Sequence, residues 1–189
     1  MQLEQYQEFI EKTWNKATNQ EVHVSLLLKD EIGELASAYK KVYGYGRELD
    51  RKNVIEELGD LFYGLNTHCR LAGIVSEWDS LLQSFQANHL QQDNVTVITE
   101  DDINDIIDTL LLNAIMLRTC SKEESIEILN VFMETYRIIM YDINTSLDEI
   151  IDANYEKLIK RYPNLAFNVE HSAQRLDKQS TSNGDWQPE

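Results

Sequence analysis

Helix-breaking residues are scarce in this chain, and their scarcity constrains the fold more than any other feature. The 189 residues include only seven Gly and two Pro, about 5% of the chain where an average protein has roughly 12%. Because Gly and Pro interrupt helices and form turns, a chain with few of them is expected to form long secondary-structure elements. Apolar residues recur at the three- and four-residue spacing of amphipathic helices. The sequence therefore predicts an all-α protein.

Seven helices follow from this periodicity and from capping signals. Two span about residues 3–17 and 19–44, and five more begin at Asn53, Ser76, Thr99, Ser121 and Ser146, the third ending at Gly73 and the last before Pro163. Residues 1–169 are predicted to form one domain, with a loop that includes a short extended piece after the fourth helix. Residues 170–189 are predicted to be a polar, flexible tail.

The charge balance limits the partners of this protein. Its 33 acidic and 17 basic side chains give a formal net charge of -16, which argues against nucleic acid as a partner because binding phosphodiester chains requires a basic surface. An anionic ligand would need metal ions as intermediaries. Two widely spaced cysteines indicate a reducing compartment, and no apolar run reaches the roughly 18 residues of a membrane span. A cytoplasmic protein without a membrane partner is expected.

A near repeat is the most informative motif. The hexapeptide Asp30-Glu-Ile-Gly-Glu-Leu35 recurs as Glu56-Glu-Leu-Gly-Asp-Leu61 on the next predicted helix. On a helical projection Glu31 falls inside the apolar arc of its helix and Glu34 at its edge, while Glu57 lies at the margin of the second arc. If the two helices are antiparallel neighbours, these acids and Asp60 can face one another.

Carboxylates gathered on apolar faces need compensation. Burial and mutual repulsion disfavour their charged form, so either their pKa values rise or cations occupy the site. An all-oxygen set formed by Glu31, Glu34, Glu57 and Asp60 suits Mg²⁺, or Mn²⁺, better than Zn²⁺. A di-iron bundle would need Glu-x-x-His, and no histidine has a Glu three residues before it. Alternatively, these acids belong to ordinary helix surfaces. Gly64 beside them either leaves space for a ligand or packs helices.

These residues resemble the signature of the MazG-like all-α nucleoside triphosphate pyrophosphohydrolases, which are related to the all-α dimeric dUTPases. The family has ExxE on one helix and ExxD on the next, here Glu31-Ile-Gly-Glu34 and Glu57-Leu-Gly-Asp60. The last predicted helix resembles the family's closing helix, in which an Asn, a Lys and an Arg approach the substrate phosphates. The matching residues are Asn154, Lys157 and Arg161. A structural role is the alternative. Asn154 would then be a buried core amide, and Lys157 and Arg161 would complement the dipole at the C-terminus of the helix.

The resemblance implies a fold and a reaction. The expected fold is a helical bundle of the all-α NTP pyrophosphatase type, with extra helices inserted at about residues 76–145, before the last helix. The expected reaction is Mg²⁺-dependent hydrolysis of a (deoxy)nucleoside triphosphate between the α and β phosphates by metal-activated water. Glu31 and Glu34 would be catalytic, with Glu34 as the preferred base by analogy. A homodimer or higher homo-oligomer is also expected, because relatives commonly assemble and the insert has apolar faces.

The sequence is also compatible with two other functions. An acidic helical module could mimic DNA or dock a basic partner without catalysis, and a nucleotide sensor could keep the site without hydrolysis. A Walker-type NTPase is excluded because GxxxxGK[ST] is absent. Trp14 on the first helix is a candidate for stacking on the substrate base, with a core position as the alternative.

Overall fold

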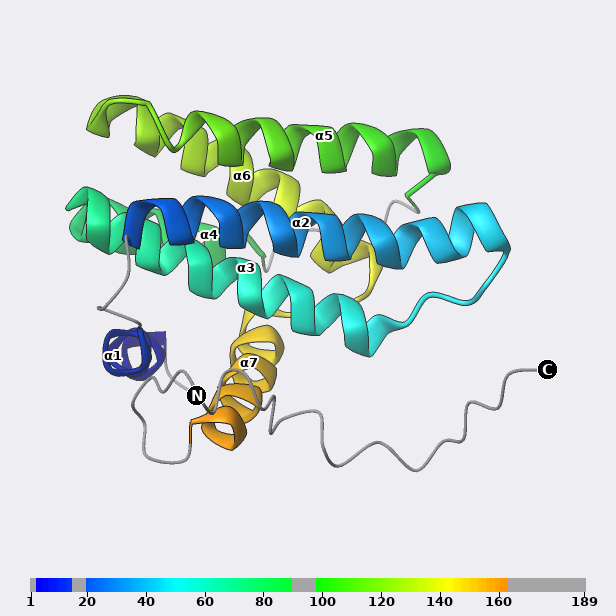
Figure 1. The fold of residues 1–189 in the computed structure, drawn as a ribbon, viewed down its shortest axis with the longest axis horizontal. Coiled ribbons are helices and arrows are strands. Elements are labelled where there is room, and N and C mark those ends of the chain that lie inside the picture. The colour runs from blue at the N-terminus through cyan, green and yellow to red at the C-terminus, as the bar shows by residue number, and fades with distance from the viewer. Residues whose placement is uncertain (1–2, 15–19, 90–97, 163–189) are drawn as a thin grey trace.

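The protein folds as a helical bundle (Figure 1). The computed structural model describes residues 3–14, 20–89 and 98–162, and these ranges contain no strand, which confirms the all-α prediction. The helices are α1 (Leu3–Thr13), α2 (Gln20–Tyr45), α3 (Arg51–Ala72), α4 (Val75–His89), α5 (Glu100–Met116), α6 (Lys122–Asp142) and α7 (Leu147–Arg161). The predicted extended piece at 90–97 and the predicted tail at 170–189 lie outside the described residues.

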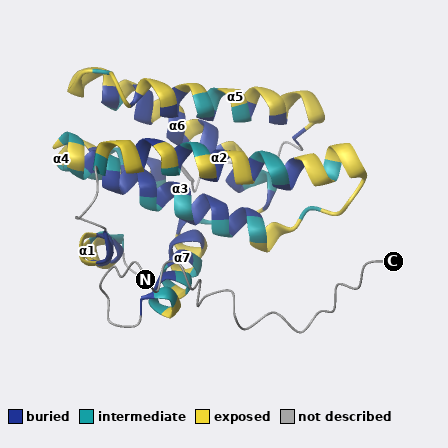
Figure 2. Cartoon of the chain, in the orientation of Figure 1, coloured by how far each residue is buried: buried dark blue, intermediate teal, exposed yellow. Residues whose placement is uncertain are grey.

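Helix α3 lies at the centre of the bundle. It runs antiparallel to α2, as predicted, while α5 packs along the other side of α2 and α6 packs against α5 (Figure 1). Helices α1 and α7 pack against α3 on the side away from α5. Figure 2 shows the resulting burial, with α3 buried along most of its length and α5 exposed along its outer face. The inserted helices α4–α6 thus complete the core around α3 and leave its α7 side for the acids.

Local capping explains where several helices begin. Thr99 and Ser121 each form a complete capping box, with Asp102 and Glu124 respectively. The predicted start of α3 at Asn53 is wrong, because Asp50 accepts the Asn53 N–H and caps the helix three residues earlier than a cap at Asn53 would. The predicted start of α4 at Ser76 is also one residue late. Gly73 ends α3 in the left-handed conformation, as expected of a C-terminal glycine.

Two glycines on α3 allow neighbouring helices to approach closely. A Cβ at Gly59 would lie 2.8 Å from Asn154 Cβ on α7, and a Cβ at Gly64 would lie 2.8 Å from Leu28 Cδ2 on α2. Of the two interpretations of Gly64, the structure therefore supports helix packing. Gly33 has no such neighbour within 4 Å.

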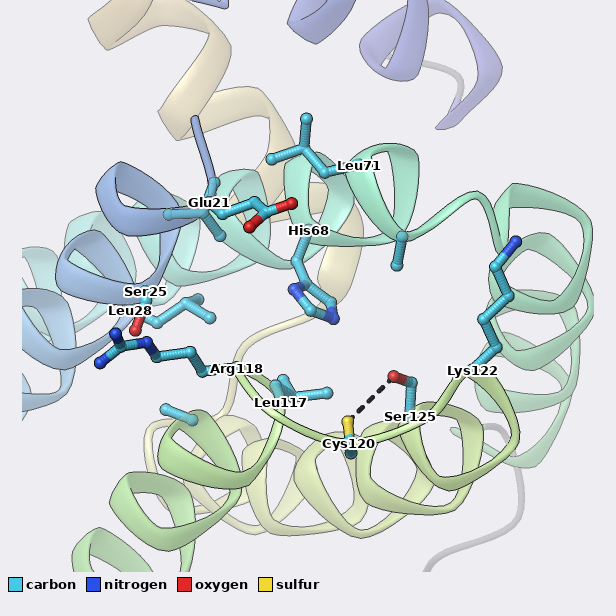
Figure 3. Close-up of a pocket in the computed structure, with 13 residues that line it drawn as sticks. Glu21, Ser25, Leu28, His68, Leu71, Leu117, Arg118, Cys120, Lys122 and Ser125 are labelled. Carbon is cyan, nitrogen blue, oxygen red and sulfur yellow. Dashed lines mark hydrogen bonds between the residues drawn. The ribbon is translucent and has the colours of Figure 1, made fainter. Parts of the chain in front are cut away.

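A cavity of about 230 Å³ lies among α2, α3 and the segment that joins α5 to α6 (Figure 3). His68 of α3 points toward this joining segment, where Cys120 lies within hydrogen-bond distance of Ser125 in the first turn of α6, with Sγ and Oγ 3.1 Å apart. The buried acids on α2 and α3 do not line it.

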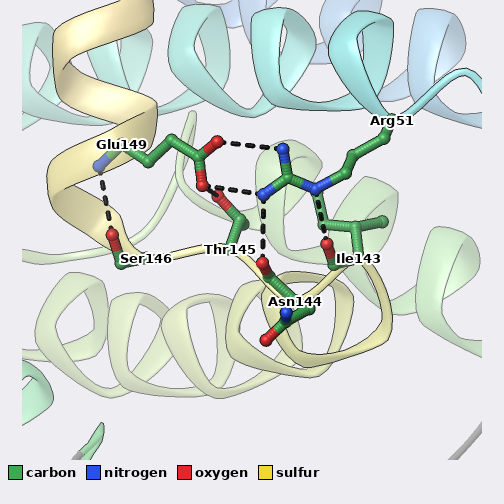
Figure 4. Close-up of polar contacts among 6 residues, drawn as sticks. All are labelled: Arg51, Ile143, Asn144, Thr145, Ser146 and Glu149. Atoms are coloured by element: carbon green, nitrogen blue, oxygen red, sulfur yellow. Dashed lines mark hydrogen bonds and ion pairs between the residues drawn. The ribbon is translucent and has the colours of Figure 1, made fainter.

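An arginine at the start of α3 fastens the connection between α6 and α7 (Figure 4). Arg51 donates through Nε to the Ile143 carbonyl at 2.8 Å and through a terminal nitrogen to the Asn144 carbonyl at 3.0 Å. It also makes a bidentate pair with Glu149, at 2.9 and 2.7 Å. Glu149 lies three residues after Ser146, where it could complete a capping box, but its carboxylate turns to Arg51 and Thr145 instead. Ser146 still caps α7 through the Glu149 N–H. The start of α7 is thereby held against α3.

No described helix is both long enough and apolar enough to cross a membrane.

Alanine substitutions at two helical glycines should separate these packing roles. Gly59→Ala should lower the free energy of unfolding by about 1–3 kcal/mol, because the new methyl group meets Asn154 Cβ near the α7 backbone. Gly33→Ala should raise it by up to about 1 kcal/mol, since Ala favours a helix and open space surrounds the site. Urea unfolding followed by circular dichroism would measure both. Equal effects at the two positions would contradict the close α3–α7 packing.

Candidate active site

Three acids from two helices converge in the bundle. Glu31 comes from α2, and Glu57 and Asp60 come from α3. Each offers a carboxylate oxygen that lies within 4.8 Å of the other two, and among the described residues this is a group that could hold a metal ion. The antiparallel packing of α2 and α3 therefore brings the two halves of the repeated motif together.

Burial distinguishes these acids from the surface charge. Glu31 is 8% exposed and Glu57 is 4% exposed, whereas Asp60 is half-buried and Glu34 is exposed. Glu34 is not part of the three-residue group, but its side chain hydrogen-bonds to Glu57 and so borders it. The position of Glu31 on the buried face, predicted from periodicity, is confirmed.

The proximity and burial of these carboxylates raise their pKa values. Burial, reinforced by the charges of Asp60 and Glu57, raises the pKa of Glu31 from 4.5 to about 9. Burial, followed by the charge of Glu34, raises the pKa of Glu57 from 4.5 to about 7. The ammonium of Lys157 lowers both values but does not cancel the shifts. The folded chain therefore holds protons here that an unfolded chain would release near neutral pH.

Helix α7 places an amide and an ammonium on Asp60. Asn154 Nδ2 donates to Asp60 Oδ1 at 2.6 Å, and Lys157 Nζ contacts the other oxygen as a short ion pair. Asn154 is fully buried, and its own carbonyl oxygen accepts from the Tyr6 hydroxyl at 2.6 Å. Burial lowers the pKa of Lys157, but the charge and hydrogen bond of Asp60 outweigh this and leave that pKa raised. Lys157 is thus a charged counterion at the acid cluster.

The other two predicted substrate-binding residues lie near the same end of α7. Arg161 is half-buried, and its charge acts on both Lys157 and Tyr63. Trp14 is 8% exposed, with its ring centroid 6.0 Å from that of Tyr63 and 5.3 Å from that of His23. Tyr63 also feels the charge of Asp60. Trp14 therefore belongs to a small aromatic group next to the acid cluster.

The donor set fits a hard divalent cation. All of its candidate ligands are carboxylate oxygens, which Mg²⁺ and Mn²⁺ prefer. A cation would also relieve the repulsion that raises the pKa values of Glu31 and Glu57, so the electrostatics favour occupancy. Lys157 supplies only one positive charge against these acids.

Sequence reasoning missed two residues that shape this site. Tyr6 was recognised only as a member of the apolar stripe of the first helix, although its hydroxyl orients Asn154. Gly59 was read only as part of the repeat, although its missing side chain admits Asn154 next to Asp60. Both roles depend on α1 and α7 meeting α3, which no local pattern in the sequence encodes.

The seven helices of the described residues and the acids shared by α2 and α3 define a bundle of the all-α nucleoside triphosphate pyrophosphatase type. Within it, residues 3–89 match the family model of phosphoribosyl-ATP pyrophosphohydrolase. The matched segment spans α1–α4 and contains all four predicted metal ligands. No curated protein and no solved structure matches the chain. The match supports a pyrophosphohydrolase of the MazG-like all-α superfamily, and it does not confirm the MazG family itself.

The raised pKa values predict how stability depends on pH in the absence of metal. Because the folded state binds protons more tightly than the unfolded state, stability contributed by Glu31 is lost as pH rises from about 4.5 toward 9. Glu31→Gln should therefore melt at least about 2 °C above the wild type at pH 9, with the gap closing toward pH 5. Melting in EDTA across this pH range would test it. A variant that is less stable than the wild type at pH 9 would contradict the buried cluster.

Proposed function

We propose that this protein is a divalent-metal-dependent pyrophosphohydrolase that cleaves a nucleotide between its α and β phosphates. The products would be the nucleoside monophosphate, or its derivative, and pyrophosphate. The observation that carries the proposal is the convergence of Glu31, Glu57 and Asp60 from two helices, with Glu34 beside them. The family match of the same segment supports the reaction class.

The acids would hold the metal and position the attacking water. Mg²⁺, when bound, would neutralise the phosphate oxygens and make water more acidic. Glu31, Glu57 and Asp60 would be its ligands. Glu34 is exposed yet hydrogen-bonds to Glu57, so it can serve as a ligand or as the base that takes the proton of the water. Glu31 would bind the metal and would help to orient the other acids of the cluster.

Helix α7 would bind the phosphate tail. Lys157 pairs with Asp60 in the ligand-free chain, and a metal ion at the acids would release its ammonium for a phosphate oxygen. Arg161, one turn further along the helix, would add a planar fork suited to a second phosphate. Asn154 is fully buried and already uses its carbonyl oxygen for Tyr6 and one amide N–H for Asp60. We therefore propose that Asn154 orients Asp60 rather than the substrate.

The base and sugar would lie toward the aromatic group of Trp14, Tyr63 and His23. Trp14 Nε1 donates to Gln20 Oε1 at 3.2 Å, which fixes the indole next to the start of α2. Since Trp14 is almost wholly buried, only an edge of it can contact a base. The substrate class then includes nucleoside triphosphates and the nucleotide named by the matched family, phosphoribosyl-ATP.

The burial of the acids disfavours the rival of a DNA-mimicking module. Mimicry requires charges that face solvent, whereas Glu31 and Glu57 are both buried. A nucleotide sensor would bind its ligand with the same geometry but would not hydrolyse it. A measurement of turnover therefore distinguishes a sensor from an enzyme.

Product analysis tests the proposed reaction. The protein should release pyrophosphate from at least one member of a panel of ribo- and deoxyribonucleoside triphosphates plus phosphoribosyl-ATP, with Mg²⁺ present. Glu57→Gln should lower kcat roughly 100-fold or more, because loss of a ligand forfeits several kcal/mol of charge stabilisation. Ion-exchange chromatography of the products would measure both results.

Glu56→Gln is the matched control for that experiment. Glu56 precedes Glu57 on α3 but points to Lys52, at 3.9 Å, and lies outside the acid cluster. Its substitution should leave kcat within about twofold of the wild type, since a lone exposed ion pair contributes little. Release of orthophosphate and a nucleoside diphosphate would contradict the cleavage position. Tight nucleotide binding without turnover would favour the sensor.

The homodimer remains a prediction. Large apolar side chains are exposed on α5 at Leu112, Ile115 and Met116 and on α6 at Val131 and Ile138, and these surfaces are compatible with self-association.

A further inference from the structure

The cavity beside α3 is a separate compartment of the molecule (Figure 3). Its walls come from the first two turns of α2, from the last turns of α3 and from residues 117–125. The acids of the candidate active site face α7, whereas this cavity opens between α3 and α6. A ligand here would therefore not compete for the metal-binding carboxylates.

A buried imidazole marks the interior of the cavity. His68 Nε2 is inaccessible to solvent and has no hydrogen-bond partner among the residues that the structure describes, and Figure 3 shows the ring directed from α3 into the space above Leu117 and Cys120. Burial lowers the pKa of His68, so the ring is neutral at physiological pH and keeps one N–H donor. A buried polar atom without a partner is unfavourable, and a hydrogen-bonding ligand would remove this cost.

The charge at this cavity has the opposite sign to that of the whole chain. Arg118 and Lys122 line it against a single acid, Glu21, which leaves one net positive charge, although the protein as a whole carries -16. In Figure 3 Arg118 lies beside Leu28, and Lys122 lies on the far side of the cavity, toward α4. A ligand with one negative charge matches this balance.

The rest of the lining is mainly apolar. Leu28, Leu71 and Leu117 contribute aliphatic surface, with Ser125 as a buried hydroxyl that already bonds to the Ser121 carbonyl. The space of about 230 Å³ exceeds the roughly 30 Å³ of one water molecule several-fold, yet is smaller than a typical drug-sized pocket. Its occupant should thus be small and partly apolar.

We propose that this cavity is a binding site for a small organic monoanion, with an apolar body of a few carbons and a carboxylate head. The apolar body would lie on Leu28 and Leu117. The carboxylate would face the guanidinium of Arg118 and, after a rotation of the imidazole that exposes Nε2–H, would accept a hydrogen bond from His68. The site does not depend on the proposed hydrolysis, because it shares no residue with the acid cluster.

Binding can be tested with three carboxylates, butyrate, hexanoate and benzoate, titrated into the metal-free full-length chain. At least one should shift the ring resonances of His68 saturably in two-dimensional NMR and slow the alkylation of Cys120 by iodoacetamide. Hexan-1-ol, which lacks the charge, should bind at least about 10-fold more weakly than hexanoate. Cys69 is buried and should not react in either case, which provides an internal control.

Two variants identify the groups responsible. Arg118→Gln should weaken carboxylate binding at least about fivefold without weakening hexan-1-ol, and His68→Leu should abolish the preference for carboxylate over alcohol. Lys41→Gln, at the opposite end of α2, should change neither. Helical circular dichroism would establish that each variant folds. If no carboxylate shifts His68 saturably, or if Arg118→Gln binds as the wild type does, the proposal is overturned.

Discussion

The packing of α7 across α3 is the constraint on which the site depends. Gly59 admits Asn154 to the α3 backbone, and Asn154 and Lys157 then hold the two oxygens of Asp60. Because Tyr6 fixes the other end of the Asn154 amide, α1, α3 and α7 are joined through one buried chain of hydrogen bonds. Arg51 fastens the start of α7 from outside. Asp60 is thereby presented to Glu31 and Glu57 in a fixed position.

This arrangement gives the excess negative charge two physical roles. Most acids are solvated on helix surfaces, and some stabilise helix starts, as Asp102 and Glu124 do. Glu31 and Glu57 are instead buried and retain protons, which is unfavourable for a structural charge and suitable for a cation site. Under the proposed function, an acidic chain would in this way bind a polyphosphate through metal, with Lys157 and Arg161 of α7 nearby.

Much of this structure could be predicted from the sequence, and the remainder depends on tertiary contacts. Periodicity identified the buried Glu31, and the capping signals located the starts of α5 and α6, because both are local properties. The start of α3 was predicted wrongly because Asp50, and not Asn53, caps the helix. The capping box at Ser146 is only half formed because the Glu149 carboxylate binds Arg51, which lies 98 residues away in the sequence. The hydrogen bond between Tyr6 and Asn154 joins residues 148 positions apart, so no local pattern indicated it.

Proton release on metal binding tests the central claim most directly. A cation that occupies the cluster must displace protons held by Glu31 and Glu57, whose pKa values are about 9 and about 7 in the metal-free chain. Calorimetric titration with Mn²⁺ at pH 7 in buffers of different ionisation enthalpy counts these protons. We expect release of about one proton or more in the wild type and markedly less in Glu31→Gln. Binding without proton release, or equal release in the two proteins, would contradict a metal site built from these buried acids.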